Sequence, residues 1–317
     1  MPTLRRLRAT RTGPAVAIAL TLLALLCGMA AGVGGGAGDG IPTPQAATAA
    51  PSLGRALGAP GADPAARHRR AREHRAIAQA LTRTPFLARG GVGRRDVALT
   101  FDDGPGPDTP GIMRVLRRTH TPATFFFVGQ QLDFFGPMLA AEARRGFAIG
   151  DHTQNHAPLG RLPARVQRRQ LVAAARGARR YGVDDLRLFR PPYGSYNRHT
   201  LQVAHALGML MVLWTIDTGD FRRPGVRAIV HAALSGARPG AIVLMHDGGG
   251  PRRQTIRALP IIIHRLRRRG YRLVTIPRLV AEDPPARHQA APPGIGQPAA
   301  VFTRSAAARR PRRARRR

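Results

Sequence analysis

Acidic side chains occur in this sequence at a point where an apolar run ends. The run 97–101 is followed by Asp102 and Asp103 and then by Gly104-Pro105. This pattern is typical of a buried strand that carries charge at its C-terminal end. Neighbouring strand side chains point to opposite faces, so both carboxylates reach one site only if the chain bends, which Gly104-Pro105 allows. The two aspartates are therefore predicted to have different roles; the alternative is an Asx-rich turn without catalytic meaning.

Two histidines, His152 and His156, follow the apolar run 147–150 and stand four residues apart. This spacing predicts that they share one face of a helical turn. Two imidazoles and a nearby carboxylate form a three-ligand site for a divalent metal and leave a position for water or substrate. A lone pair of this kind is more often surface or capping chemistry, but Asp102 and Asp103 in the same chain favour metal binding.

The elements that must position these residues are apolar runs alternating with helix-like segments from about residue 94 to 280. Predicted strands are 97–101, 123–128, 147–150, 188–190, 209–216, 241–245 and 272–276; predicted helices are 111–118, 136–145, 163–181, 198–207, 226–235 and 254–269. This alternation indicates parallel strands joined by right-handed crossovers. The ends of such strands meet on one face of a parallel barrel. Polar residues lie at or just after the ends of five of the runs: Asp102/Asp103, Asp151/His152/His156, Arg190, Asp217/Asp220 and His246/Asp247.

Five segments resemble, in order, the motifs of the polysaccharide deacetylase (NodB-homology) family, carbohydrate esterase family four. They are Thr100-Phe101-Asp102-Asp103-Gly104-Pro105, His152-Thr153-Gln154-Asn155-His156, Arg190-Pro191-Pro192-Tyr193-Gly194, Asp217-Thr218-Gly219-Asp220-Phe221 and Leu244-Met245-His246-Asp247. The match spans roughly residues 94–280. The resemblance implies an α/β fold, namely a distorted, incomplete (β/α)7-type barrel.

The resemblance also implies how the first three motifs act. Asp103, His152 and His156 would hold a divalent metal, Zn²⁺ first, with Co²⁺ or Ni²⁺ as alternatives. Asp102 would be the general base that takes a proton from the attacking water. Arg190 would pair with Asp102 and keep it ionised and oriented; the alternative for Arg190 is an ordinary surface arginine.

The last two motifs would supply the acid and its support. By the resemblance, His246 protonates the leaving group, which an imidazole can do near neutral pH. An aspartate of the fourth motif orients His246 and raises its pKa. We favour Asp220 over Asp217, although spacing alone does not separate them.

The remaining motif residues would shape the acetyl pocket and substrate groove. The backbone N–H of Tyr193 would stabilise the oxyanion, on a loop stiffened by two prolines. Leu244 and Phe221 would form apolar walls; family members usually carry Trp where this chain has Phe221. Trp214 is predicted to pack in the core.

The composition is strongly cationic. The 317 residues include 51 Lys and Arg, all of them arginine, against 17 Asp and Glu, for a formal charge of +34. Such a charge predicts attraction to polyanions: nucleic acid, anionic lipid or acidic cell-wall polymer. The apolar N-terminal segment and the lack of a basic recognition motif argue against a specific nucleic-acid partner.

The chain divides into four predicted segments. Residues 1–33 are a signal peptide or signal anchor, and residues 34–93 are a low-complexity linker with a basic helix at about 65–87. Residues 94–281 form the catalytic domain, and residues 282–317 form a disordered Arg/Pro-rich tail. We therefore expect an extracellular or envelope location, with membrane contact if the N-terminal segment is uncleaved. Cys27, the only cysteine, lies in the apolar run, so the exported part has no disulfide.

These inferences lead to one expected function. The protein is expected to be a metal-dependent hydrolase of non-peptide carbon–nitrogen bonds that removes N-acetyl groups from cell-wall or chitin-like polysaccharides. Peptidoglycan is the first expectation, because a cationic enzyme meets an anionic wall. The Arg-rich tail would contact polymers of that wall; the alternative is a tail that is only solvated. The alternatives are an acetyl-xylan esterase of the same family and a non-catalytic wall-binding protein on the same fold.

Overall fold

The computed structural model describes residues 64–292 and residue 295. The predictions for the leader, Cys27 and most of the Arg-rich tail lie outside the described residues. None of the helices within 64–292 is long and apolar enough to cross a membrane.

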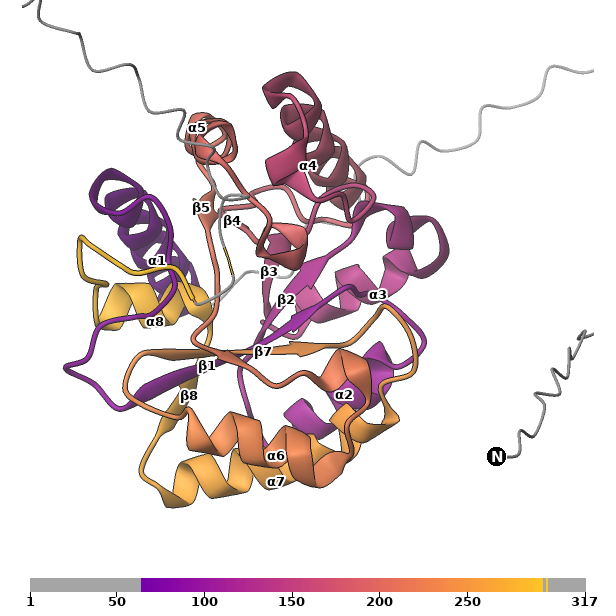
Figure 1. Ribbon diagram of the computed structural model, residues 1–317, viewed down its shortest axis with the longest axis vertical. Coiled ribbons are helices and arrows are strands. Elements are labelled where there is room, and N and C mark those ends of the chain that lie inside the picture. Colours follow the sequence, from indigo (N-terminus) through magenta and orange to yellow (C-terminus); the bar gives the residue numbers. More distant parts are fainter. Residues whose placement is uncertain (1–63, 293–294, 296–317) are drawn as a thin grey trace, which may run out of the picture. The chain divides into compact units, whose positions relative to one another are not determined.

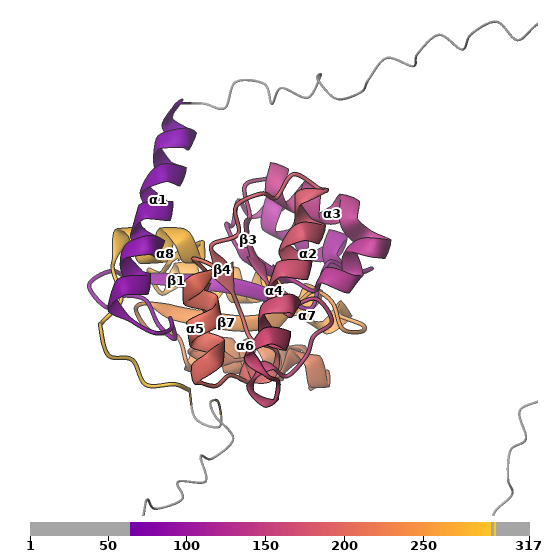
Figure 2. The same ribbon diagram turned by 90° about the horizontal axis from the view of Figure 1, so that it is seen from above.

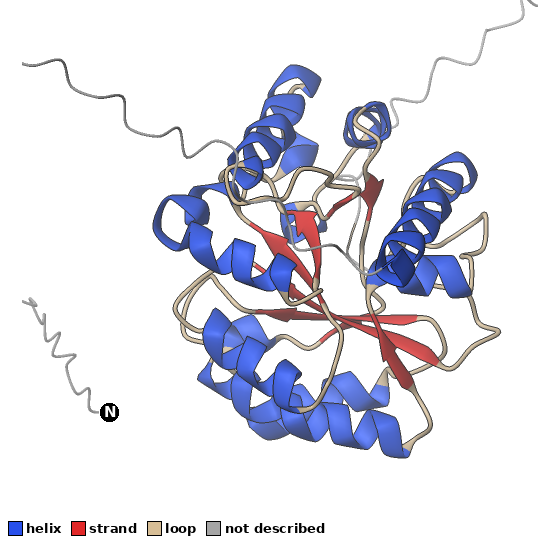
Figure 3. Cartoon of the chain, turned by 180° about the vertical axis from the view of Figure 1, so that it is seen from behind, coloured by secondary structure: helices blue, strands red, loops and turns tan. Residues whose placement is uncertain are grey.

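Eight parallel strands form one curled sheet (Figures 1 and 3). They are β1 (Asp96–Asp102), β2 (Thr124–Phe127), β3 (Ala148–Asp151), β4 (Leu188–Phe189), β5 (Leu210–Met211), β6 (Ile216–Asp217), β7 (Ala241–His246) and β8 (Arg272–Val274). Seven follow the order β5-β4-β3-β2-β1-β7-β6, and β8 pairs with β1. The expected incomplete (β/α)7-type barrel is confirmed.

Strand β1 is the centre of the sheet. All seven of its residues are buried. One edge pairs with β7 from Val97 to Asp102, while the other pairs first with β8 and then with β2. Parallel sheets covered on both faces need apolar side chains on both faces, which explains the nearly continuous apolar run before Asp102.

The predicted strand 209–216 is wrong in one respect: it is two strands at opposite edges of the sheet. β5 pairs with β4, β6 pairs with β7, and residues 212–215 cross the opening between them. The carbonyls of Val212 and Leu213 accept hydrogen bonds from the Arg190 guanidinium, at 3.3 and 3.1 Å. An apolar run indicates that the segment is buried but not which strand its backbone pairs with. The break between β5 and β6 therefore cannot be predicted from the sequence.

The helices lie outside the sheet (Figure 3). They are α1 (Pro64–Arg83), α2 (Thr109–Arg118), α3 (Leu132–Arg144), α4 (Ala164–Arg179), α5 (Arg198–Ala206), α6 (Val226–Ser235), α7 (Arg253–Arg268) and α8 (Ile276–Glu282), with short 3₁₀ turns η1 (Gly129–Gln131), η2 (Leu159–Arg161), η3 (Pro192–Gly194) and η4 (Asp220–Arg222). Their apolar residues recur at helical spacing. In α7, Leu259, Ile262 and Leu266 are fully buried in the core cluster that contains β1 and β7.

The packed body extends beyond the predicted bounds 94–281. Helix α1 buries Ile77 and Ala80 and packs on α8 (Figure 2). On the other side, the Gln289 side chain accepts hydrogen bonds from the amides of Ala88 and Arg89 at 2.8 and 2.9 Å. The basic helix is therefore part of the folded body and not a solvated linker.

Candidate active site

The two aspartates after the central strand diverge at Asp103. Asp102 is the last residue of β1 and is 3 % exposed, whereas Asp103 has a left-handed backbone with φ of +73°. The bend thus begins one residue earlier than Gly104-Pro105. It lets both side chains serve the same end of the sheet from different directions.

Asp103, His152 and His156 lie together. One oxygen of Asp103 lies 3.1 Å from Nε2 of His156 and 3.5 Å from Nε2 of His152. The three ligand atoms are all within 4.8 Å of one another. Asp102 is adjacent, with Oδ2 3.7 Å from His152 Nε2. The sequence-predicted base and ligands are therefore placed in one cluster.

The histidine pair does not lie on a helical turn, which corrects that expectation. Residues 152–158 form a loop, in which Thr153 and His156 are left-handed with φ of +72° and +58°. The loop is tied by hydrogen bonds from the Gly129 and Gln130 amides to the carbonyls of Thr153 and Gln154, at 2.9 and 2.8 Å. Left-handed backbone turns the two rings toward Asp103, a geometry that spacing cannot report.

The donor set fits a divalent metal. The outer nitrogen of each ring is already bonded: His152 Nδ1 donates to the Arg190 carbonyl at 2.8 Å, and His156 Nδ1 lies 3.0 Å from the Tyr193 hydroxyl. This leaves both Nε2 atoms facing the buried Oδ1 of Asp103. Burial alone would raise the pKa of Asp103, but hydrogen bonding to and charge from the histidines hold it well below its usual range. Such oriented imidazoles with an ionised carboxylate are typical of zinc ligands.

Arg190 is fully buried inside the barrel, which excludes the surface-arginine alternative. Its Nη1 donates to Asp102 Oδ1 at 2.7 Å and to the Thr100 hydroxyl at 2.8 Å. Its guanidinium also stacks 4.2 Å from the centre of the Phe126 ring. Burial lowers the pKa of Arg190, and the charge of Asp102 opposes that shift. The Arg190 side chain therefore holds Asp102 and also binds the segment 212–215 between β5 and β6.

Asp220, and not Asp217, supports His246. His246 Nδ1 donates to Asp220 Oδ1 at 2.7 Å, while Asp220 Oδ2 accepts the His246 amide at 2.9 Å and the Thr255 hydroxyl at 2.7 Å. Asp217 is exposed and accepts the Gly219 amide. Burial alone would lower the pKa of His246, but the Asp220 hydrogen bond and charge, with smaller contributions from the Asp102 and Asp103 charges, raise it to about 9.

Replacing Asp220 by asparagine should move the alkaline limit of activity. An acid works only while protonated, so activity that depends on His246 falls as pH rises through about 9. In Asp220→Asn the burial remains and the main raising interactions are lost. The alkaline limb of kcat/KM should then move down by about 2 pH units or more. An Asp217→Asn control should keep the limb in place, and an unmoved limb in both variants would contradict the role of Asp220.

Two exposed aromatic rings flank the cluster. Tyr193 is left-handed, with φ of +59°, and its side chain is 69 % exposed; within residues 64–292 its amide N–H has no backbone acceptor. Phe221 is 41 % exposed and lies edge-on to His246, 5.5 Å between centroids. Leu244 is buried beside Trp214 in one core cluster, as predicted for Trp214. Tyr193 thus lies beside His156 and Phe221 beside His246, and both rings are open to solvent.

Sequence reasoning missed the threonines that hold the acidic groups. The Thr255 hydroxyl fixes Asp220, and the Thr109 hydroxyl donates to Asp247 at 2.5 Å. Burial raises the pKa of Asp247, which directly follows His246. Asp247 could have been predicted as a site residue because it belongs to the fifth motif. Nothing in the sequence marks Thr109 or Thr255.

Comparison with known proteins identifies the family. A polysaccharide deacetylase family model matches residues 89–212. A chitooligosaccharide deacetylase of Bradyrhizobium sp. (strain ANU 289) is 36 % identical over 200 residues, 59 % of this chain and 91 % of that protein. The chain belongs to the polysaccharide deacetylase family.

Other polysaccharide deacetylases agree with this. A peptidoglycan-N-acetylglucosamine deacetylase of Bacillus cereus is 35 % identical over 58 % of this chain and 87 % of its own length. The solved Bc1960 peptidoglycan N-acetylglucosamine deacetylase superposes with a TM-score of 0.60 at 30 % identity, covering 62 % of this chain and 94 % of that one. The family is one of hydrolases.

One structural neighbour of this chain is a family pseudoenzyme. A Bacillus anthracis chain described as a family pseudoenzyme is 28 % identical with a TM-score of 0.58, covering 63 % of this chain and 69 % of that one. The family-model match also ends before the fourth and fifth motifs. The structure itself brings these two motifs together, because Asp220 of the fourth motif accepts a hydrogen bond from His246 of the fifth.

Proposed function

We propose that this polysaccharide deacetylase hydrolyses N-acetyl groups on a cell-wall or chitin-like polysaccharide, with peptidoglycan as the first substrate. The relatives named above act on chitooligosaccharide or peptidoglycan. The observation that carries the proposal is Asp102 beside the Asp103/His152/His156 cluster, with Oδ1 held by Arg190 and Oδ2 left toward His152. A base and a ligand set are thus adjacent, and Arg190 supports both: its guanidinium binds Asp102 and its carbonyl accepts a hydrogen bond from His152.

Asp103, His152 and His156 would hold the metal, and zinc suits two imidazoles and one carboxylate. When bound, such a metal polarises the acetyl carbonyl and makes water acidic enough to ionise near neutrality. The chain's own part is to present the three ligand atoms from fixed side chains. His152 and His156 are fixed through their Nδ1 atoms, as described above.

The catalytic steps follow from the remaining side chains. Asp102 accepts a proton from the attacking water, because Arg190 occupies its other oxygen and keeps it oriented. The Tyr193 amide is available to donate to the developing oxyanion. His246, protonated with a pKa of about 9, delivers a proton to the leaving amine. The proton then returns to His246 from the base or solvent before the next turnover.

Location and further partners are part of the same proposal. An apolar N-terminal segment preceded by arginines supports export, either by cleavage or as a membrane anchor. The Arg-rich C-terminal sequence supports contact with anionic wall polymers. No specific nucleic-acid partner is proposed.

Acetate release tests the proposed function. The purified protein is incubated with peptidoglycan, chitooligosaccharides or acetyl-xylan, before and after chelator treatment and zinc reloading. We expect release from peptidoglycan or chitooligosaccharides, loss after chelation, and recovery on reloading. Release from acetyl-xylan alone would favour the esterase alternative. No release from any of the three after reloading would favour a wall-binding protein without turnover.

A further inference from the structure

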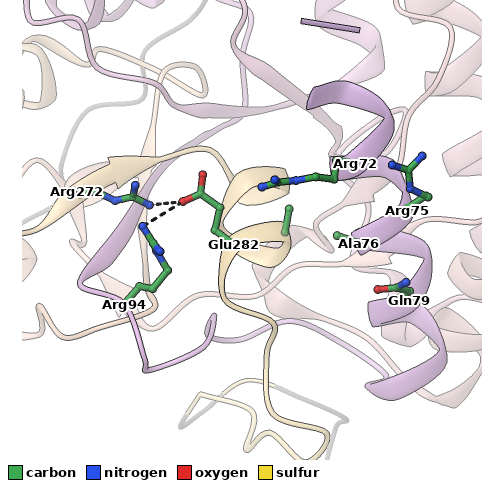
Figure 4. A pocket seen from close by; sticks show the side chains of 8 residues that line it. Arg72, Arg75, Ala76, Gln79, Arg94, Arg272 and Glu282 are labelled. Carbon is green, nitrogen blue, oxygen red and sulfur yellow. Dashed lines mark hydrogen bonds and ion pairs between the residues drawn. The ribbon is translucent and has the colours of Figure 1, made fainter. Parts of the chain in front are cut away.

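A second concave region lies away from the catalytic residues, between α1 and the amino-terminal ends of β1 and β8 (Figure 4). It has a volume of about 620 Å³, and its polar lining consists of Arg72, Arg75, Arg94, Arg272, Glu282 and Gln79. Asp102 and His246 stand at the opposite, carboxyl-terminal ends of β1 and β7. The arginine cavity is therefore separate from the candidate active site.

Two of its arginines are held in place by carboxylates. Arg272 makes two 2.8 Å hydrogen bonds to Asp96, which is 1 % exposed, and Arg94 Nε lies 3.3 Å from the same carboxylate. Glu282 pairs with Arg272 and lies 3.6 Å from Arg94 (Figure 4). These contacts fix two guanidinium groups on the wall of the cavity.

The other two arginines are not paired. Arg72 and Arg75 stand three residues apart on α1, so they share one face of the helix. Neither side chain makes a hydrogen bond or an ion pair with any residue that the structure describes. Figure 4 shows the Arg72 side chain extending across the cavity toward Glu282. Counting Asp96 and Glu282 against the four arginines leaves two cations in excess.

We propose that the arginine cavity binds phosphodiester groups of a flexible polyanion. Guanidinium groups bind phosphate oxygens through two parallel hydrogen bonds, and unpaired arginines retain that capacity. The cavity volume is typical of a small-molecule site and exceeds the size of one phosphate, so it accommodates a segment of polymer. Bound phosphates supply the negative charge that the cavity lacks.

The lining favours a polymer such as poly(glycerol phosphate) over a membrane or nucleic-acid bases. Of the two large apolar side chains of α1, Ile77 is buried and Leu81 is partly buried in the core, so this helix presents no large exposed apolar side chain for insertion into lipid. The lining also contains no aromatic side chain on which bases could stack. Recognition therefore depends on phosphate alone. The site would hold an anionic polymer on the face opposite the deacetylation site.

The test compares two double variants of the full-length chain. Arg72→Gln/Arg75→Gln removes the unpaired cavity arginines, and Arg176→Gln/Arg179→Gln removes two exposed arginines at the same spacing on α4. Both lose two charges, and the N- and C-terminal arginines are retained in each. Binding of poly(glycerol phosphate) is measured between about 50 and 200 mM salt, because phosphate contacts make affinity salt-dependent.

We expect the cavity variant to bind roughly tenfold more weakly at the low-salt end and to show a shallower salt dependence, with the control within about twofold of the unaltered chain. Equal weakening of both variants would show that net charge alone acts and would overturn the site. Deacetylation of a short chitooligosaccharide should be the same in both variants. This second measurement shows that the cavity substitutions leave the catalytic residues intact, whereas the binding result itself does not depend on the proposed function.

Two further arms distinguish the source of the phosphate. A single-stranded oligonucleotide with the same number of phosphates should show the same or a smaller difference between the variants. A larger difference would indicate base recognition and contradict the proposal. Vesicles containing phosphatidylglycerol should not separate the variants. A difference seen with vesicles and not with poly(glycerol phosphate) would assign the cavity to a lipid surface instead.

Discussion

Replacing Asp102 by asparagine should lower acetate release by a factor of about 10³ while leaving the metal content unchanged. Asparagine keeps the shape of Asp102 and can still accept the Arg190 hydrogen bond, but it cannot take a proton from water. Oδ2 of Asp102 lies next to His152 and is not one of the three ligand atoms that Asp103, His152 and His156 bring together. The expected result is a folded, metal-containing and nearly inactive protein, measured by acetate release and by metal analysis of the same preparation.

The matched comparison is His152→Ala, which removes a proposed metal ligand instead of the proposed base. His152 is 2 % exposed, and its two nitrogens face Arg190 and Asp103. Its loss should therefore remove both activity and bound metal. Equal metal loss in the two variants would contradict the separate roles given to Asp102 and the ligands, as would full metal retention by His152→Ala.

Replacing Arg190 by glutamine should cause the largest loss of stability of any single change considered. The guanidinium binds Asp102, Thr100 and the carbonyls of residues 212 and 213, all of which are buried and would lose this partner. Removing one partner of a buried ion pair costs about 3–5 kcal/mol, because a buried charge is left unpaired. For a body of this size the melting temperature should fall by about 10 °C.

Arg187→Gln is the control for Arg190→Gln. Arg187 pairs with Asp185 at the surface, where its side chain is 42 % exposed, and surface ion pairs contribute about 0–1 kcal/mol. Arg190→Lys should give an intermediate loss, since an ammonium keeps the charge but not the guanidinium geometry. Thermal unfolding curves of the three variants, recorded at one pH, provide the comparison. Similar melting temperatures for the Arg187 and Arg190 variants would show that Arg190 does not hold the barrel opening.

Much of the site was predictable because parallel strands bring their carboxyl ends together. Asp102, His152, Arg190 and His246 follow four different apolar runs, and the sheet places them in one region. Their order along the chain also carried the family resemblance. The sequence thus located the cluster without any knowledge of its distances.

The remaining features depend on backbone turns that residue types do not encode. Asp217 and Asp220 are both acidic and both in the fourth motif, and only the left-handed turn at Gly219 decides which of them faces His246. The histidine loop is similar, because i,i+4 spacing fits a helix as well as the observed turn. The interruption of the strand at 212–215 could be predicted only if the contact with Arg190 were known, and Arg190 lies more than twenty residues earlier in the chain.

The left-handed backbone of Asp103, Thr153, His156 and Tyr193 has a consequence for how this protein can evolve. A non-glycine residue in that conformation costs roughly 1–2 kcal/mol, which is a sizeable part of a total folding free energy of about 5–15 kcal/mol. Glycine at these positions would relieve this conformational cost and raise the stability of the folded chain. At Asp103 and His156 it would also delete the side chains that converge on one another. Selection for heat resistance and selection for hydrolysis therefore oppose each other at these residues, and tolerance to heat must be gained elsewhere in the fold.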